Sequence, residues 1–325
     1  MSLENFAKFP EYLKKIEEIV DKEVENGLKN IFYVGTGGTY STGMPFKYYA
    51  DQITDMPVYN EAAPELIHMN HKQLGKGSLC IWTSATGNTK DVLNGMEFTR
   101  SKGAHNLALV EAKESPMEPL ADNFFAEVPG DVMHALIFFA ELRAFFKRGE
   151  FPKYEKLAEQ FAKCGEAFEN APKVYNSRCI YYAARNNDGS IPHFVVGAGA
   201  TYGTAYCWGM CVMEEMQWMR TKIINAAEFF HGAIELCEKD TPFIIVKGED
   251  GGRELCERVE RFIAPLTKEV LVFDTKEIEL PVDDEFRPLL SSLVADSVVY
   301  TLMKPFEVER NHDLKVRRYY RQMEY

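Results

Sequence analysis

The spacing of apolar residues changes repeatedly along the first part of the chain. A helical spacing over residues 11–28, closed by Gly27, is followed by an apolar run at 31–34 that is typical of a buried strand. This alternation predicts strands at 31–34, 57–59, 78–82 and 107–110 and helices at 11–28, about 39–51 and about 88–102. Strands that alternate with helices in this way indicate a parallel sheet covered by helices.

Three strongly apolar helices are predicted next, and the alternation then begins again. These helices, at 132–147, about 153–169 and about 171–186, are expected to connect the two rounds. The second round has predicted strands at 193–196, 243–246 and 270–273 and predicted helices at about 201–219, 251–263 and 288–303. Because the elements recur in the same order, both halves are expected to share one fold.

A sequence repeat supports this duplication. Residues 34–43 read VGTGGTYSTG, and residues 196–205, 162 positions later, read VGAGATYGTA. A chain of 325 residues is long enough for two domains that each bury a core. We therefore predict an α/β protein of two tandem domains, residues 1–165 and 166–325.

Composition and charge narrow the classes of function. With 46% apolar and 26% charged residues, and no apolar run near the length of a membrane span, the chain is expected to be soluble, with no membrane partner. Residues 1–5 lack the basic and apolar regions of a secretion signal, so the cytoplasm is the expected compartment. The net charge of −12 argues against a nucleic-acid partner.

The seven cysteines are scattered through apolar segments and form no Cys-x-x-Cys pair. Buried thiols are therefore expected, rather than disulfides or metal ligands. Cys207 and Cys211 would share a helix face, and a metal role for them is the less favoured alternative. We predict neither a metal nor a cofactor.

The turn after the strand at 78–82 is rich in hydroxyl groups. Ser84, Thr86 and Thr89 surround Gly87, and Asn88 and Thr89 open the next helix. Backbone N–H groups at a helix N-terminus together with hydroxyls around a tight turn form an anion-binding site. The turn is therefore a candidate phosphate site.

Helix capping and dinucleotide binding are the two other interpretations of the glycine and hydroxyl turns. The hydroxyls can be ordinary helix caps, but the matching turn at 246–251, VKGEDG, also opens a helix and has none. A dinucleotide site would need a third glycine where the chain has Tyr40, and no Lys-Ser or Lys-Thr pair completes a P-loop. Glu61 is more simply explained as an acidic residue at a helix N-terminus than as a ribose ligand. Thr39, in the first glycine turn, adds a further donor to the phosphate hypothesis.

Candidate acid–base groups lie in the second half. Glu214 and Glu215 are on an otherwise apolar helix, so one carboxylate is expected to face inward, where loss of water would suit it to proton transfer. His231 follows sixteen residues after Glu215, next to two phenylalanines, and in isolation a core histidine is the favoured interpretation. Lys315 is a third candidate, with a solvated basic tail as the alternative.

These residues resemble the double sugar isomerase (SIS) domain family. The phosphate turn of glutamine–fructose-6-phosphate aminotransferase, Ser-Gln-Ser-Gly-Glu-Thr, is matched by residues 84–89, and its Gly-Thr-Ser-Tyr motif by residues 37–40. The sixteen-residue spacing of Glu215 and His231 also matches, and the stretch 225–232 is most similar to the fructosamine 6-phosphate deglycases. The resemblance implies two tandem SIS domains with flavodoxin-like, three-layer α/β/α folds.

The resemblance also implies a function and a set of site residues. The substrate would be a 6-phosphofructosyl amino acid, cleaved by water to glucose 6-phosphate and the free amino acid. Glu215, His231 and Lys315 would be the catalytic residues, and the phosphosugar would be bound by Gly37, Thr39, Ser84, Thr86, Asn88 and Thr89. Each site would use both domains, with the histidine supplied by a second subunit, so a homodimer or higher homo-oligomer is expected.

Several alternatives remain open. Val212 stands where the aminotransferase has a lysine, which argues against the same isomerisation, but an aldose–ketose isomerase or a glucosamine 6-phosphate deaminase is still possible. A non-catalytic sugar-phosphate sensor is less favoured, since such a protein would not need Glu215 and His231. The attached amino acid is not defined, and Arg317 or Arg318 is a candidate contact for its carboxylate.

Overall fold

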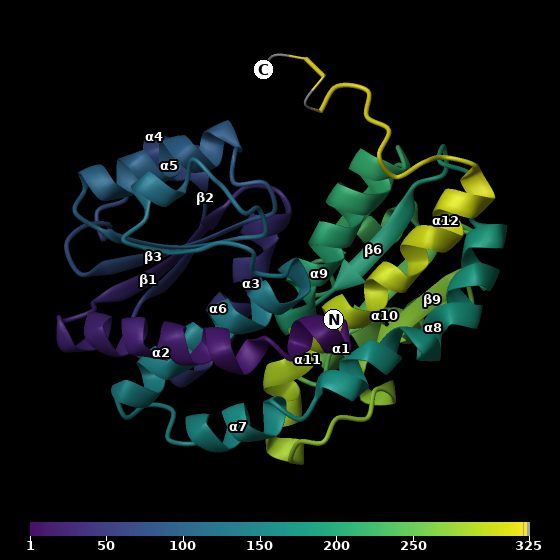
Figure 1. The fold of residues 1–325 in the computed structure, drawn as a ribbon. Helices are drawn as coiled ribbons and strands as arrows, with labels where there is room; N and C mark the ends of the chain where they lie inside the picture. The colour runs from purple at the N-terminus through teal and green to yellow at the C-terminus, as the bar shows by residue number, and fades with distance from the viewer. Residues whose placement is uncertain (321, 324–325) are drawn as a thin grey trace. The chain divides into compact units, whose positions relative to one another are not determined.

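A computed structural model describes residues 1–320, 322 and 323, and the chain forms two compact units, Met1–Glu166 and Ala167–Tyr325. Each unit contains one parallel β-sheet with helices packed on both faces (Figure 1). The predicted α/β class with two duplicated sheets is therefore confirmed.

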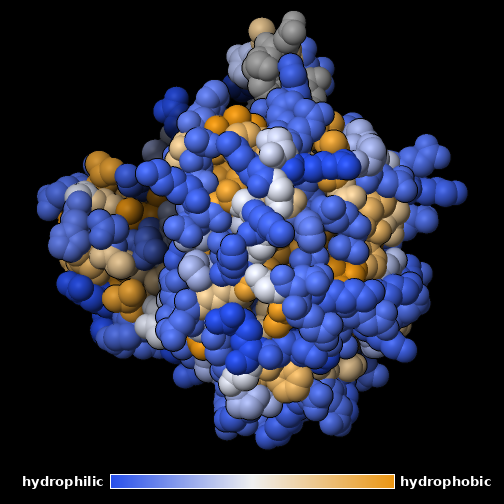
Figure 2. Space-filling model, turned by 90° about the vertical axis from the view of Figure 1, so that its left-hand side faces the viewer, coloured by the Kyte–Doolittle hydropathy of each residue, from blue (hydrophilic) through white to orange (hydrophobic). Residues whose placement is uncertain are grey.

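Hydrophilic side chains dominate the face drawn in Figure 2, and apolar side chains form small separate groups among them. Among the described residues, no helix is both long enough and apolar enough to cross a membrane.

The first sheet has the strand order β2-β1-β3-β4-β5, and all neighbouring strands are parallel. This is the order of the flavodoxin-like doubly wound folds. The strands are β1 (Asn30–Gly35), β2 (Val58–Ala62), β3 (Ser78–Ser84), β4 (His105–Val110) and β5 (Asn123–Phe125). Every residue of β1 and β3 is buried, which explains their uninterrupted apolar runs.

Helices cover both faces of the first sheet. They are α1 (Leu3–Phe6), α2 (Phe9–Glu25), α3 (Gly38–Ile53), α4 (Ala63–Met69), α5 (Lys90–Ser101), α6 (Gly130–Lys147) and α7 (Tyr154–Phe161), with the 3₁₀ turn η1 (Glu118–Leu120). Successive residues of a strand point to opposite faces. Phe32 therefore packs with α4 and α5, whereas Tyr33 packs on the other side against Phe46 of α3, which stacks on Phe138 of α6.

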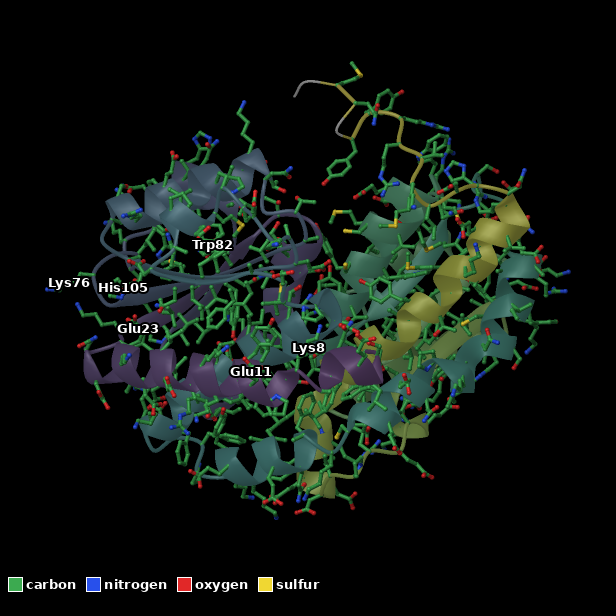
Figure 3. The ribbon with its side chains drawn as sticks, viewed as in Figure 1. Lys8, Glu11, Glu23, Lys76, Trp82 and His105 are labelled. Carbon is green, nitrogen blue, oxygen red and sulfur yellow. The ribbon has the colours of Figure 1, made fainter. Side chains whose placement is uncertain are left out.

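Helix α2 packs on α6 and is also tied to the sheet by a polar contact. Its apolar side is buried through Phe9, Leu13 and Ile16. Near its end, both carboxylate oxygens of Glu23 lie 2.9 Å from Nδ1 of His105, the first residue of β4 (Figure 3). The hydrogen bond to Glu23 raises the pKa of the His105 imidazole.

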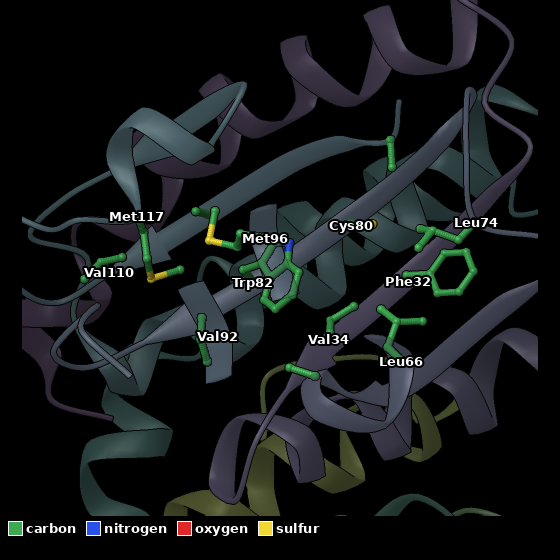
Figure 4. Packing of buried hydrophobic residues seen from close by; sticks show 13 residues of the cluster. Phe32, Val34, Leu66, Leu74, Cys80, Trp82, Val92, Met96, Val110 and Met117 are labelled. Carbon is green, nitrogen blue, oxygen red and sulfur yellow. The ribbon is translucent and has the colours of Figure 1, made fainter. Parts of the chain in front are cut away.

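The core between the first sheet and helices α4 and α5 is centred on Trp82 (Figure 4). Its indole Nε1 donates to Oδ1 of Asn106 at 3.0 Å, and both residues are fully buried. A Cβ atom at Gly95 of α5 would lie only 2.7 Å from the Trp82 ring. The absence of a side chain at Gly95 therefore lets α5 approach the sheet closely enough to cover the tryptophan.

The second sheet repeats the order of the first with one strand fewer, β7-β6-β8-β9. Its strands are β6 (His193–Gly197), β7 (Thr221–Asn225), β8 (Phe243–Lys247) and β9 (Val270–Asp274). Its helices are α8 (Gly165–Arg185), α9 (Tyr202–Cys207), α10 (Arg253–Ile263), α11 (Arg287–Val299) and α12 (Met303–Arg310), with a π-helix η3 (Trp208–Met216) and 3₁₀ turns η2 (Gly199–Thr201), η4 (Ala233–Leu236), η5 (Thr275–Glu277), η6 (Asp284–Phe286) and η7 (Tyr300–Leu302). Helix α10 covers one face, and α9 and α11 pack on the other.

Several predicted elements differ in the structure. Helices α6 and α7 belong wholly to the first unit, so only α8, which begins at Gly165, fits the predicted connection between the halves. The predicted helix at 201–219 becomes α9 and the π-helix η3. The one at 288–303 is α11, which ends earlier, at Val299, and is followed by the turn η7 and α12. Strands β5 and β7 were not predicted, because these edge strands are only partly buried and lack an apolar run.

Candidate functional site

The first glycine turn joins β1 to α3 and is built around Thr39. The Thr39 hydroxyl accepts a hydrogen bond from the amide of Thr36 and donates one to its carbonyl, both at 3.0 Å. A Cβ atom at Gly35 would lie 2.4 Å from this hydroxyl, so the turn requires glycine there. Gly37, with φ of 58°, precedes the helix. The hydroxyl of Thr39 thus holds the turn together, beside the N-terminus of α3.

The second turn, residues 85–89, joins β3 to α5. The buried Ser84 hydroxyl accepts a hydrogen bond from the amide of Gly87 at 2.8 Å, and Thr86 donates to Oδ1 of Asn88 at 2.7 Å. Thr89 is the N-cap residue of α5, but its side chain makes no capping hydrogen bond. Helix capping therefore does not explain this group of hydroxyls, and Thr86 and Asn88 are exposed to solvent.

The loop that follows β4 forms hydrogen bonds with this turn. The amides of Glu111 and Ala112 donate to the carbonyls of Ser84 and Ala85, both at 3.1 Å. The Ser115 hydroxyl donates to the carbonyl of Gly87 at 3.2 Å. The turn is therefore fixed by its neighbour on the sheet as well as by its own hydroxyls, and such preorganisation favours ligand binding.

The corresponding turn of the second unit is shifted by one residue from its predicted place. In the first sheet Val34 pairs with Trp82, so the next residue, Gly35, is level with the residue before Ser84. In the second sheet the counterpart of Gly35, Gly197, pairs with Val246, the residue before Lys247. Ser84 therefore corresponds to Lys247, not to Val246 as the constant offset predicts. The Lys247 ammonium is buried and lies 2.7 Å from Glu260 and 3.3 Å from Asp274.

Acidic side chains of the chain itself occupy this second turn. Oδ1 of the buried Asp250 accepts hydrogen bonds from the amides of Gly252, at 2.8 Å, and Ala200, at 3.4 Å. Glu249 forms a two-pronged ion pair with Arg287, at 2.8 and 2.6 Å. Amides that face a ligand in an anion-binding turn are here bonded to a carboxylate of the protein. The loss of hydroxyls in the second copy thus has a structural counterpart.

Glu214 and Glu215 lie near the end of the π-helix η3. Glu214 is exposed and accepts a hydrogen bond from Thr221. Oε1 of Glu215 lies 2.9 Å from Nε of Arg317, and the two side chains are 28% and 15% exposed. Of the two carboxylates, Glu215 is thus the partly buried one, and it faces Arg317. A π-helix has a wider turn than an α-helix, so 3.6-residue spacing does not assign its buried side.

The segment after α12 packs against the end of η3. The side-chain amide of the buried Gln217 donates to the carbonyl of His312 at 2.9 Å. The Trp218 ring contacts the His312 ring, with centroids 4.3 Å apart, and the Arg318 guanidinium lies 4.0 Å from the Trp218 ring centroid. The Lys315 side chain is exposed. The tail is thus docked beside Glu215 through His312, Arg317 and Arg318, a contact that sequence analysis did not find.

His231 is exposed, so its interpretation as a core histidine is wrong. Phe229 is fully buried and Phe230 partly so, but the chain then turns outward, with the amide of His231 bonded to the carbonyl of Glu228 at 3.0 Å. Gly232 follows with φ of 130°, a conformation that favours glycine. Among the described residues, the His231 ring has no hydrogen-bond partner.

The candidate glutamate and histidine come from elements on opposite faces of the second sheet. The π-helix that carries the glutamate packs through Gly209 on Val195 of β6. The segment that carries the histidine packs through Phe229 on Phe194, the preceding residue of the same strand. Since consecutive strand residues face opposite ways, the sheet lies between the two elements.

A comparison with known proteins identifies the family. The SIS domain family matches residues 27–129. Fructosamine deglycase FrlB of Bacillus subtilis is 31% identical over 311 residues, which are 92% of this chain and 93% of that protein. The chain belongs to the SIS-domain fructosamine deglycase family. Fructoselysine 6-phosphate deglycase of Escherichia coli is 22% identical over 308 residues, 94% of this chain and 89% of that protein.

More distant relatives and solved structures agree with this SIS-domain assignment. Glutamine–fructose-6-phosphate aminotransferase of Thermotoga maritima is 24% identical over 264 residues, 76% of this chain and 41% of that protein. A crystal structure of a Bacillus subtilis protein assigned as a phosphosugar isomerase superposes with a TM-score of 0.88 at 29% identity, covering 96% of this chain and all of that one. The tandem SIS fold is therefore confirmed.

Other chemistry-bearing groups of this SIS-domain chain are mostly structural. None of the seven cysteines forms a disulfide; four are buried as predicted, and Cys207, Cys211 and Cys237 are only partly buried. Burial raises the pKa of Cys164, Cys179 and Cys256 to about 12. No group of three potential metal ligands occurs among the described side chains. A cavity of about 390 Å³ lies between α8 and β9, and none of the candidate residues lines it.

Proposed function

We propose that this chain hydrolyses a 6-phosphofructosyl amino acid to glucose 6-phosphate and the free amino acid. The observation that carries the proposal is the contrast between the two turns: the first keeps exposed hydroxyls at a helix N-terminus, and the second is filled by Asp250. A site for one phosphate per chain suits a phosphorylated sugar. Membership of the fructosamine deglycase family supports the remainder of the assignment.

The first unit is assigned the phosphate. Ser84 already accepts a hydrogen bond from Gly87, so its own O–H remains to donate to a phosphate oxygen. The side-chain amide of Asn88 adds N–H donors near the N-terminus of α5, and Thr86 orients it by donating to its Oδ1. Thr89 is the N-cap residue of the same helix, and Thr39 and Gly37 add the start of α3. Holding the phosphate at one end fixes the open-chain carbons at a set distance, which is how an enzyme makes proton transfer at chosen atoms efficient.

Glu215 is assigned the proton transfers. It takes a proton from C1 of the open-chain substrate while the C2 oxygen gains one, giving an enaminol. Return of a proton to C2 and loss of the N–H proton give an imine between C1 and the nitrogen. One water molecule then cleaves the imine into an aldehyde, which is glucose 6-phosphate, and the amine of the amino acid. His231 is assigned to ring opening and to proton transfer at oxygen.

The arrangement of Glu215 and His231 supports a site completed by a second copy of the chain. Their elements pack on opposite faces of one sheet, so the sheet separates them. A single small substrate would not touch both side chains of one subunit. The exposed His231 ring is free to enter a neighbouring subunit's site, and we therefore propose a homodimer as the working unit.

The test is a pair of neighbouring substitutions assayed on 6-phosphofructosyl amino acids. Glu215→Gln should lower the rate of glucose 6-phosphate release by roughly 10² to 10⁴-fold, the usual contribution of a general acid–base group, while phosphate-dependent binding remains. The matched control is Glu214→Gln, which removes a charge from the adjacent residue and should keep most activity. Normal turnover in Glu215→Gln would overturn the assignment. Assaying amino acid against ammonia separates deglycation from deamination.

A further inference from the structure

Arg317 is held in one orientation by three separate contacts. Its Nε lies 2.9 Å from Oε1 of Glu215, and its Nη1 donates to the carbonyls of Leu314, at 2.5 Å, and Val316, at 3.0 Å. Its side chain is 15% exposed. Among the described residues, its Nη2 group has no hydrogen-bond partner. Nε and Nη2 lie along one edge of the guanidinium, so once Glu215 releases Nε this edge is suited to bind a carboxylate in a two-pronged geometry.

This contact places a positive charge on the group assigned to take a proton. Oε1 of Glu215 accepts the hydrogen bond from Nε of Arg317, so the carboxylate must leave the guanidinium before this oxygen can turn to the substrate. If Arg317 remained on Glu215 throughout the reaction, it would therefore oppose the step assigned to that residue. The ion pair of Glu215 and Arg317 is compatible with the reaction if a group of the substrate replaces Glu215 as the partner of Arg317.

The substrate class in the proposed function carries such a ligand. In a sugar attached to an α-amine, only the nitrogen and the α-carbon separate C1 from the carboxylate carbon. A base that reaches the C1 proton therefore has the substrate carboxylate close by. Arg317 touches Glu215, so it is in the region where that carboxylate must lie.

We propose that Arg317 is the residue that recognises the carboxylate of the amino acid portion, exchanging its contact with Glu215 for one with the substrate. This inference rests on the proposed function and adds the specificity to it. Binding of the carboxylate neutralises Arg317 and frees Glu215 as a proton acceptor in the same event. A sugar phosphate without the carboxylate would leave the ion pair in place and would be a poor substrate.

Arg318 and Lys315 do not have this geometry. The Arg318 guanidinium lies over the Trp218 ring, 4.0 Å from its centroid, and its side chain is exposed. Lys315 is also exposed, and its backbone amide, not its ammonium, donates to Asp313. Arg318→Ala therefore serves as the matched control, since it removes the same charge from the next residue of the tail.

The experiment uses two substrates that differ only in the carboxylate, 6-phosphofructosyl-glycine and 6-phosphofructosyl-methylamine. For the wild-type chain, kcat/KM should favour the glycine compound by about 10- to 100-fold, the range expected for a charge-assisted hydrogen bond. Arg317→Ala should bring the ratio close to one, mainly by lowering the value for the glycine compound. Arg317→Lys should give an intermediate ratio, and Arg318→Ala should keep the wild-type ratio.

The outcomes separate this inference from the function on which it rests. Release of amine from both compounds with equal efficiency by the wild-type chain would overturn the role of Arg317 and leave the deglycase proposal standing. So would a wild-type ratio in Arg317→Ala. Release from neither compound would overturn the proposed function and the inference with it. The ratio of the two kcat/KM values for the wild-type chain is measured without any substitution. It therefore tests the role of the substrate carboxylate even if the Arg317 variants no longer hold the C-terminal segment in place.

Discussion

The hydroxyl of Ser84 accepts a hydrogen bond from the amide of Gly87, three residues later, at 2.8 Å. A serine hydroxyl has one proton to donate and two lone pairs to accept with. The bond with Gly87 shapes the turn while the proton stays available. One side chain thus has both a structural and a binding role, and this makes its removal informative.

Ser84→Ala should weaken the binding of 6-phosphofructosyl-glycine by about 10-fold or more, because one charge-assisted hydrogen bond to phosphate is lost. The dissociation constant can be measured by calorimetry in the inactive Glu215→Gln background. Ser101→Ala is the control, since the exposed Ser101 hydroxyl donates only to the carbonyl of Phe98 in its own helix. An unchanged dissociation constant in Ser84→Ala would assign the hydroxyl to the turn alone.

Two glycines with positive φ allow the steric demand of the turn to be isolated. Gly87 has φ of 65°, and a Cβ atom there would lie 2.0 Å from the Ser115 hydroxyl oxygen. Gly103 has φ of 79°, but its nearest neighbour would be 3.9 Å away. Both alanine variants should be destabilised by about 1 kcal/mol from backbone strain, and Gly87→Ala by a further 1 kcal/mol or more from the contact.

Denaturant unfolding of the two glycine variants measures this difference. Gly87→Ala should in addition weaken phosphate binding, because Ser115 and the turn must move apart, whereas Gly103→Ala should bind normally. Equal stability and equal binding in the two variants would mean that the turn adapts without cost, and that its preorganisation is unimportant.

The sequence repeat predicted the two sheets well but misplaced their second turn by one residue. The strands at 31–34 and 193–196 are apolar on both faces, and this pattern depends only on burial by helices. Register between neighbouring strands depends on hydrogen bonds across the sheet, which a constant offset cannot represent. Lys247 therefore emerged as the counterpart of Ser84 only from the strand pairing.

The candidate residues were identifiable by motif, but their surroundings were not. The spacing of Glu215 and His231 is a local property of the sequence. The contact of Glu215 with Arg317 joins residues about a hundred positions apart, and the outward turn at His231 depends on how Phe229 packs beneath it. Periodicity predicted a helix at 201–219 but could not indicate the π-helix within it, where the number of residues per turn changes.

Glu141 in α6 provides a test of the first unit's core. The residue is fully buried, and neither carboxylate oxygen has a hydrogen-bond partner among the described residues. Burial raises the pKa of Glu141 well above its usual value, the neighbouring Tyr33 hydroxyl opposes part of this rise, and the charge of Asp51 adds to it. The folded state therefore holds a proton that the unfolded chain releases above about pH 4.5. This bound proton stabilises the folded state fully below about pH 4.5, and the stabilisation is lost as the pH rises toward the pKa of Glu141 in the folded state.

Glu141→Gln removes this titration. The free energy of unfolding of the variant should gain on that of the wild type as the pH rises from about 5 to about 8, by at most about 1.4 kcal/mol per pH unit. Urea unfolding at four pH values in this range measures the gain. Glu97→Gln, at an exposed position of α5, is the control and should show no such trend. A difference between variant and wild type that stays constant with pH would show that Glu141 does not titrate in this way.

The opposite placement of Glu215 and His231 on the second sheet gives the final prediction. Glu215→Gln and His231→Asn should each be nearly inactive as homodimers. When equal amounts of the two chains are refolded together, half of the dimers should be mixed.

If each site takes its histidine from the partner subunit, a mixed dimer has one site with both substitutions and one with neither. Activity should therefore recover to about a quarter of the wild-type value. His68→Asn, at an exposed position of α4, should be active alone. If the glutamate and histidine of one chain worked together, every site in the mixture would lack one group, and activity would not return.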